Sequence, residues 1–432
     1  MLVLLLALAL PAAVSAQTPE DQQPIDLDKM ELARKARAAQ FPVSKRVTRY
    51  LAAAGEASAE GDPAKAKALL NKLNPKTLNP HERALVYRLQ AFVAYAAQDY
   101  DAMIKYLDMV LAEEVLSVEV ENKVRFNKAQ IYGSLQQWDK VIAALDEWFR
   151  YVRTPAPVSY YLLGIAYYQL DKLDLAISNT EKAIELANPP AEGWLQFLAA
   201  LHIQKENHRA AAPILEQLVL RFPKKSYWLQ LSLVYGSINT TKHSLAVQEL
   251  AYHQGLLTED QDLRRLARSY VYHDLPYPAA KVLEKGIEQG VIQKDVGVYE
   301  LIANSWIAAR EYDRALPPLR QAAELSKDGK LFVRLGQVYL QREEWIEAAE
   351  ALGQGLQKGG LENPGSANLM QGIAWYNANR IPDAHASFVR AQGHASTRAE
   401  ADRWITYLAG AQGGGSAPAV GDSQAEASGA RG

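Results

Sequence analysis

Residues 159–189 read SYYLLGIAYYQLDKLDLAISNTEKAIELANP. In the first half, bulky residues and one glycine recur at three- and four-residue steps, which places them on a single face of a helix: Tyr160, Leu163, Gly164 and Tyr167. After the break at residues 170–172, Ala176 and Ala183 form a stripe of small side chains on a second helix. The sequence Asn-Pro-Pro at 188–190 then ends that helix. The stretch therefore predicts a hairpin of two closely packed helices.

The same spacing recurs along the chain and divides it into similar units. The small-residue position of each predicted second helix recurs every 33 to 38 residues: Ala66, Met103, Val141, Ala176, Ala211, Ala246, Ala279, Ala315, Ala348 and Ala384. Twelve residues earlier, in all units but the sixth, lies a small residue of the first helix: Ala54, Ala91, Ala129, Gly164, Ala199, Ala267, Ala303, Gly336 and Gly372. In the sixth unit Ser232 lies fourteen residues before Ala246, and we attribute the difference to a two-residue insertion in the loop at 239–242.

This order of residues resembles the tetratricopeptide repeat, which has a period of about 34 residues. The resemblance implies an all-α fold, an α-α superhelical solenoid of about ten helical hairpins. One hairpin cannot bury its apolar face alone, so neighbouring copies must stack. We expect the solenoid over residues 43–394 and a capping helix over 395–409, where Trp404 and Leu408 share one face.

The ends of the chain have a different composition from the repeats. Residues 1–16, MLVLLLALALPAAVSA, predict a signal peptide cleaved before Gln17, although no Lys or Arg precedes the apolar run and an uncleaved anchor is the alternative. Residues 17–42 are expected to form a flexible leader and an N-terminal helix. The Gly/Ala/Ser-rich stretch at 410–432 is expected to be disordered.

The composition excludes several classes of function. The chain has 432 residues, a net charge of −2 and 49% hydrophobic residues, so it offers no electrostatic case for a nucleic-acid or membrane-surface partner. It contains no cysteine, which removes disulfides, thiolate metal sites and cysteine nucleophiles.

No catalytic pattern is complete. His81-Glu82 is not followed by the second histidine of a helical zinc motif, and the glycines at 353–360 lack the preceding strand of a phosphate loop. We therefore expect no metal, no cofactor, no small-molecule substrate and no enzymatic activity. A hydrolase with paired carboxylates is the remaining catalytic alternative.

A second set of positions on the first helices lies away from the buried face. Counted as −3, +1 and +4 from the small residue of each first helix, these positions hold aromatic and basic side chains in the second to fourth units: Arg88, Phe92, Tyr95, Phe126, Tyr161 and Tyr168. Lys123, three residues before Phe126, falls near the same line. In tetratricopeptide proteins this face lines the concave groove, so the resemblance implies a peptide-binding surface. Aromatics beside cations suit a segment with apolar anchors and some negative charge. The alternative is that these side chains only pack on a neighbouring second helix.

One known subclass of these proteins holds a terminal carboxylate with a Lys/Asn clamp. Asn304 is the only asparagine in a matching slot, and Glu300 rather than lysine precedes it by one turn. This departure argues against capture of a terminal carboxylate.

Two stretches resemble the tetratricopeptide proteins associated with bacterial TonB systems. They are FPVSKRVTRYLAAAGE at 41–56 and LAVQELAYHQGLLTEDQDLRRLARSYVYHDLPYPAAKVLEKGIEQG at 245–290. The resemblance implies a periplasmic adapter or scaffold linked to TonB, ExbB and ExbD and to transport across the outer membrane. A scaffold of another envelope assembly, such as polysaccharide or peptidoglycan machinery, is the alternative.

Overall fold

The computed structural model describes residues 25–410. The predicted signal peptide, the leader up to residue 24 and the tail from residue 411 lie outside the described residues. Between residues 25 and 410 the regular elements are all helices and no strand occurs, which confirms the all-α fold. The chain divides into two compact units, Met1–Pro223 and Lys224–Gly432, called here the N-terminal and C-terminal units.

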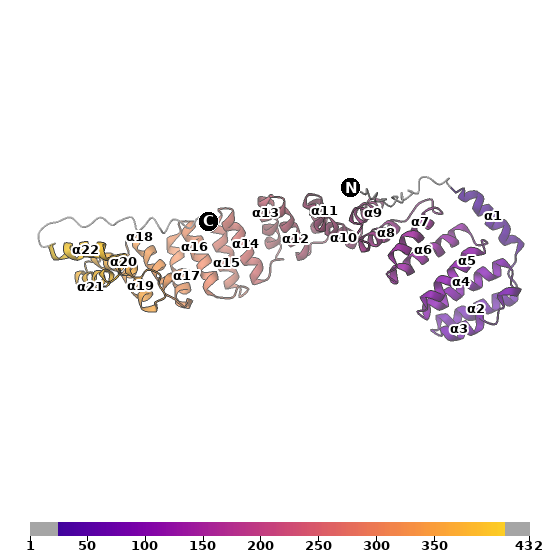
Figure 1. Cartoon of the computed structure of the whole chain (residues 1–432), viewed down its shortest axis with the longest axis horizontal. Helices are drawn as coiled ribbons and strands as arrows, with labels where there is room; N and C mark the ends of the chain where they lie inside the picture. Colours follow the sequence, from indigo (N-terminus) through magenta and orange to yellow (C-terminus); the bar gives the residue numbers. More distant parts are fainter. Residues whose placement is uncertain (1–24, 411–432) are drawn as a thin grey trace, which may run out of the picture. The chain divides into compact units, whose positions relative to one another are not determined.

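The N-terminal unit contains a single helix followed by five hairpins, coloured indigo to magenta in Figure 1. The single helix is α1 (Leu27–Gln40), and a short 3₁₀ helix, η2 (Pro75–Thr77), precedes the second hairpin. The hairpins are α2 (Lys45–Ala59) with α3 (Pro63–Leu70), α4 (Pro80–Ala96) with α5 (Tyr100–Ala112), α6 (Val118–Ser134) with α7 (Trp138–Phe149), α8 (Pro157–Gln169) with α9 (Leu173–Leu186), and α10 (Glu192–Gln204) with α11 (His208–Arg221).

The C-terminal unit contains five further hairpins and a final helix (Figure 1). The hairpins are α12 (Lys225–Ser237) with α13 (Thr241–His253), α14 (Asp260–Tyr272) with α15 (Pro276–Glu288), α16 (Val296–Ala308) with α17 (Tyr312–Leu325), α18 (Lys330–Gln341) with α19 (Trp345–Lys358), and α20 (Pro364–Asn377) with α21 (Ile381–Gln392). The final helix is α22 (Arg398–Gly410). Within each unit the second helix of one hairpin packs on the first helix of the next, as the solenoid requires.

Small residues bring the two helices of a hairpin together, as the spacing predicts. In the α8–α9 hairpin, Ala176 is fully buried against the face that carries Gly164. A Cβ atom added at Gly164 would lie 2.5 Å from Thr180 Oγ1 and 3.2 Å from the carbonyl oxygen of Ala176. No side chain fits at this crossing without moving α9, which explains why the position is glycine.

Each hairpin turns at one residue with a left-handed backbone conformation. The φ angles lie between 56° and 81°, and only the first of these residues is glycine: Gly61, Gln98, Gln136, Asp171, Glu206, Asn239, Asp274, Arg310, Glu343 and Asn379. At Glu206 the following amide, Asn207 N–H, donates to the His202 carbonyl oxygen at 2.9 Å, which closes the end of α10 in a Schellman motif. The turn thus recurs with the period of the repeat, although a left-handed residue with a side chain costs roughly 1–2 kcal/mol.

The register predicted for the sixth repeat is wrong. Ala246 is exposed, whereas Ser244 packs on the first helix and donates its Oγ hydrogen bond to the Ser232 carbonyl oxygen at 2.8 Å. Ser244 lies twelve residues after Ser232 and five after the turn residue Asn239, so the loop contains no insertion. Serine replaces the small apolar residue at both positions, so Ala246, two residues later, matches the sequence pattern better than Ser244 does.

Helix α1 has no buried side chain and is held mainly by charge. Arg34 Nε lies 3.1 Å from Glu121 Oε1 on α6, and the Glu121 side chain is fully buried. Arg34 also donates to the Glu114 carbonyl oxygen at 2.7 Å, while the Glu31 carboxylate accepts the Val118 amide hydrogen at 2.8 Å. The helix therefore caps the start of α6 from 87 residues away in the sequence.

Helix α22 packs on the last hairpin, in the region where a capping helix is expected. Trp404 is 3% exposed and stacks on Phe388 of α21 with ring centroids 5.1 Å apart. Ala401 is fully buried at the same contact, and Leu408 packs at its edge. The apolar face of α21 is thereby removed from water.

Candidate functional site

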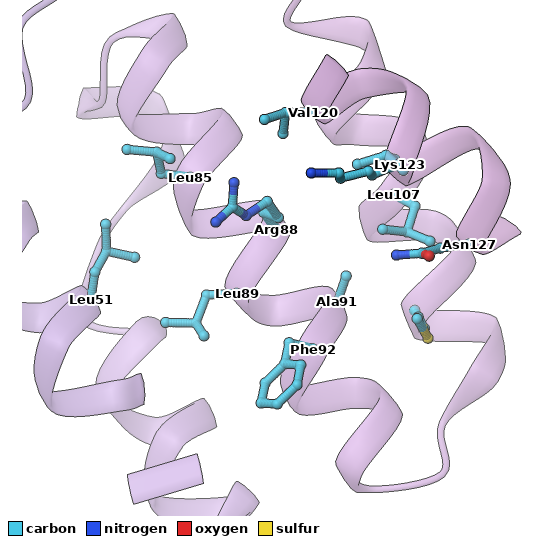
Figure 2. A pocket seen from close by; sticks show the side chains of 12 residues that line it. Leu51, Leu85, Arg88, Leu89, Ala91, Phe92, Leu107, Val120, Lys123 and Asn127 are labelled. Carbon is cyan, nitrogen blue, oxygen red and sulfur yellow. The ribbon is translucent and has the colours of Figure 1, made fainter. Parts of the chain in front are cut away.

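A groove opens in the N-terminal unit between the first helices of three successive hairpins. It has a volume of about 590 Å³ and is lined by side chains of α2, α4 and α6, with α5 beneath. Figure 2 shows Leu51, Leu89 and Phe92 along one part of the groove, with Lys123 and Asn127 on the facing helix. The predicted residues Arg88, Phe92 and Lys123 come together here.

The floor and walls of the groove are largely apolar. Leu51, Leu85, Leu89 and Val120 are half-buried, so each leaves part of its side chain open to the groove. Phe92 is 55% exposed, which is high for an aromatic ring on a regular helix. An open apolar groove with one prominent aromatic ring is typical of a surface that receives a partner's side chains.

Two cations lie at this apolar surface. Arg88 is exposed and has no ion-pair or hydrogen-bond partner among the residues that the structure describes. Lys123 lies 2.7 Å from Glu119 one turn earlier on α6, but both side chains are at least 70% exposed, so the pair is weak and exchangeable. Both side chains line the same groove, Arg88 from α4 and Lys123 from α6 (Figure 2). The groove therefore combines apolar contact area with net positive charge.

Tyr95 lies one turn beyond Phe92 on α4 and does not line the groove. Its ring is 54% exposed and meets Tyr100 edge to face at 6.4 Å. It extends the exposed aromatic surface of α4 toward the turn of the hairpin.

Phe126 lies in a different environment from Phe92. It is half-buried, and its ring lies 5.2 Å from Trp148 on α7, the second helix of the same hairpin. The Trp148 ring meets that of Phe149 edge to face, and the Phe149 ring lies 5.0 Å from Tyr160 on α8. Phe126 is thus part of the packing between the third and fourth hairpins.

Tyr161 and Tyr168 form a separate aromatic cluster on α8. Tyr161 stacks on Trp194 of α10 at 5.1 Å, and both tyrosines meet Phe197 edge to face, at 5.8 and 5.5 Å. Burial raises the pKa of Tyr161 above its ordinary value. The two tyrosines thus pack on α10, the first helix of the next hairpin, whereas the packing alternative expected contact with a second helix.

Trp194 and Phe197 were not among the predicted residues, and neither were the groove residues Leu51, Leu85 and Leu89. A signal for them exists in the sequence. Leu85 and Leu89 lie six and two residues before Ala91, on the side of α4 next to Phe92. A search for aromatic and charged residues at fixed slots overlooks aliphatic residues that form the floor.

The buried carboxylates of the chain have structural roles. Glu82 accepts the amide hydrogens of Ser44 at 2.9 Å and Asn79 at 3.2 Å. Burial raises its pKa, but these hydrogen bonds outweigh burial and hold the pKa of Glu82 below its ordinary value. Glu121 is neutralised by Arg34, and Asp262 by Lys225 at 2.6 Å. Each of the three carboxylates thus has hydrogen-bond or ion-pair partners within the fold.

Residues 25–410 contain neither a cluster of metal ligands nor a membrane-spanning helix. Three or more metal-ligating side chains do not come together anywhere in this range. None of its helices is both long and apolar enough to cross a bilayer.

Comparison with known proteins gives distant similarities. No family model matches the chain. Tetratricopeptide repeat protein 21B of Mus musculus is 24% identical over 279 residues, which cover 59% of this chain and 21% of the mouse protein. The chain thus spans about a fifth of that relative's length. The mouse protein is named for the tetratricopeptide repeat, and the hairpins of this chain recur with the period of that repeat.

Solved structures with similar folds are also distant. Naa15/Naa10 bound to HypK-THB is 16% identical, with a TM-score of 0.44 over 76% of this chain and 51% of the other. YrrB, described as a TPR protein with an unusual peptide-binding site, is 14% identical, with a TM-score of 0.34 over 43% of this chain and 95% of YrrB. Neither similarity bears on function, because both TM-scores are below 0.5.

Proposed function

We propose that the protein is a non-catalytic interaction scaffold whose N-terminal unit binds a peptide segment of a partner protein in the groove between α2, α4 and α6. An apolar side chain of the partner contacts Phe92 and Leu89, and an acidic group lies between Arg88 and Lys123. The observation that carries this proposal is the exposure of Phe92 beside an unpaired arginine within an apolar groove.

The energetic argument concerns what the free protein leaves unsatisfied. A ring as exposed as that of Phe92 gains roughly 25 cal/mol for each Å² that a partner covers. Arg88 can accept a carboxylate without first losing an internal partner, since none exists within residues 25–410. A segment that carries both an apolar side chain and an acid therefore gains from two neighbouring contacts.

The other predicted residues enter the proposal in different ways. Tyr95, Tyr161 and Tyr168 are proposed as outer contacts for a longer segment, because each keeps part of its ring exposed. Phe126 is proposed to contribute indirectly: it packs on Trp148 within the hairpin that carries Lys123 and so helps to hold Lys123 in position.

We further propose that the protein is exported to the periplasm and works with a TonB, ExbB and ExbD system. Support comes from the apolar run and small residues of 1–16 and from the resemblance of 41–56 and 245–290. The mass of the mature protein in an envelope fraction tests the first part, because cleavage before Gln17 removes residues 1–16. An intact Met1 in a cytoplasmic fraction contradicts both parts.

Peptide selection on the full chain tests the groove. A selected peptide is then titrated calorimetrically against the wild type, Phe92→Ala and Arg88→Ala. Leu233→Ala is the matched control, since Leu233 is a 65% exposed apolar residue on a first helix of the C-terminal unit. We expect each groove variant to lose about 2 kcal/mol of binding free energy, which is roughly thirtyfold in affinity. The free energy of unfolding should stay within about 0.5 kcal/mol of the wild-type value.

The same titration separates binding from packing at the aromatic cluster. If Tyr161 and Tyr168 only pack, alanine at either position lowers the melting temperature by several degrees and leaves the affinity intact. Unchanged affinity in both Phe92→Ala and Arg88→Ala contradicts the groove assignment.

A further inference from the structure

We infer that the C-terminal unit carries a second docking surface, independent of the groove, for an acidic segment of a partner protein. The surface consists of Arg265, Arg268 and Tyr272 on α14, and it is called here the arginine surface. It borders an open hollow of about 400 Å³.

The three side chains project from one face of α14. Arg265, Arg268 and Tyr272 are spaced by three and four residues, so they lie side by side along the helix. Both arginines are exposed, and the Tyr272 ring is 73% exposed with only an edge contact to His273 at 5.1 Å. Two like charges one turn apart weaken an isolated helix slightly, so helix stability does not explain their placement.

The acidic residues at the start of α14 already have partners. Asp260 pairs with Arg264, which also lies 2.9 Å from Asp295. Glu259 and Asp262 both pair with Lys225, at 2.7 and 2.6 Å.

No such partner reaches the arginine surface. Within the described part of the chain, neither Arg265 nor Arg268 has an ion pair or a hydrogen bond. The surface therefore carries two positive charges without a counter-charge, next to an open aromatic ring.

A buried hydrogen-bond network supports this face of α14. Gln248 Nε2 donates to Ser232 Oγ at 2.9 Å, and Ser269 Oγ donates to Gln248 Oε1 at 3.0 Å. Ser244 Oγ donates to the Ser232 carbonyl oxygen at 2.8 Å. The network joins α12, α13 and α14, and Ser244 and Ser269 reach from it to the hollow. The arginines thus project from a wall whose position is determined by directional bonds, which favours a preorganised contact.

The spacing of the arginines identifies the partner's chemistry. Residues three apart on a helix have Cβ atoms about 5–6 Å apart. Alternate side chains of an extended segment lie on one side and are about 6.7 Å apart, so two carboxylates at alternate positions can each meet one guanidinium. An aromatic residue of the same segment then covers Tyr272. A nucleic-acid strand needs a longer track of cations, and the chain's net charge of −2 does not supply one.

Fluorescence anisotropy tests this inference on the full chain. The probe is a labelled, end-capped peptide with the sequence Gly-Glu-Gly-Glu-Gly-Tyr-Gly, and its neutral counterpart carries Gln at both acidic positions. The test variant is Arg265→Gln with Arg268→Gln. The matched control is Arg310→Gln with Arg403→Gln, which removes the same charge from two exposed arginines elsewhere in the C-terminal unit, at the turn after α16 and on α22.

We expect the acidic peptide to bind the wild type and the control within twofold of each other, and the test variant at least tenfold more weakly. The neutral peptide should bind at least tenfold more weakly than the acidic peptide, and Tyr272→Ala should weaken the acidic peptide at least threefold. Circular dichroism verifies that all variants keep the helical content of the wild type.

Three outcomes overturn the inference. The first is that the acidic peptide does not bind up to millimolar concentration. The second is that the test and control variants weaken its binding equally. The third is that a single-stranded oligonucleotide binds the wild type as tightly as the acidic peptide does and that the test variant loses this binding. The titrations are repeated in a Phe92→Ala, Arg88→Ala background, so that binding of the acidic peptide in the proposed groove is excluded and the groove is judged separately.

Discussion

Replacing Arg34 by alanine removes the main partner of a fully buried carboxylate. The guanidinium of Arg34 lies 3.1 Å from Glu121 Oε1, while the second partner, Arg125, lies 3.8 Å from Oε2. Loss of one partner of a buried ion pair typically costs 3–5 kcal/mol. Because Arg125 remains, and α1 has no buried side chain of its own, we expect a loss of about 2–4 kcal/mol at the contact between α1 and α6.

The effect should depend on pH, and its sign follows from the pKa of Glu121. Burial raises this pKa, and Arg34 and Arg125 lower it only part of the way back. A carboxyl group with a raised pKa contributes stability below its unfolded pKa of about 4.3, and this contribution is lost as the pH rises through the folded pKa. Without Arg34 the folded pKa rises further. The cost of Arg34→Ala is therefore largest near pH 7.5 and shrinks toward pH 5.

Hydrogen–deuterium exchange with mass spectrometry measures this local loss. A loss of 2–4 kcal/mol corresponds to amides in α6 that exchange roughly 30- to 700-fold faster at pH 7.5, since 1.4 kcal/mol is a factor of ten. Amides in α16 should not change, because a solenoid transmits stability mainly between neighbours. Lys35→Ala is the control, since Lys35 lies next to Arg34 but is 71% exposed. Equal exchange of α6 in the two variants would show that the ion pair does not hold α1.

Three further predictions concern the repeats. Glu343→Gly should raise the free energy of unfolding by about 1 kcal/mol in urea titrations, because Glu343 has a φ of 60°; no gain would mean that the turn is not strained. Gly372→Ala should lower the free energy of unfolding by about 1–3 kcal/mol, because the new Cβ would lie 2.5 Å from the Phe388 ring. Gly236→Ala has open space around the new Cβ and should raise the free energy of unfolding by up to about 1 kcal/mol. A change of the same sign in both variants contradicts this prediction. Deleting the whole hairpin 158–188 should leave more helix in the circular dichroism spectrum at 37 °C than deleting α9 alone, since half a repeat exposes an unmatched apolar face.

The number of hairpins and the type of fold follow from local spacing, so they could be predicted from the sequence. Each repeat places its small residues, its turn and its apolar stripe within about 34 neighbouring residues. The sixth repeat shows the limit of such counting. Serine can take the place of alanine at a helix crossing when its hydroxyl group finds a backbone acceptor, as Ser244 does at Ser232.

Which side chains remain exposed was decided by the tertiary structure. Phe92 and Phe126 occupy the same predicted face of their first helices, yet Phe92 is open and Phe126 is covered by Trp148 of α7. The partner of a charge is equally nonlocal, since Arg34 and Glu121 are 87 residues apart. The periodicity along a helix determines which face a side chain occupies. Exposure and charge pairing depend on what the neighbouring helices place against that face, and this follows only from the packed structure.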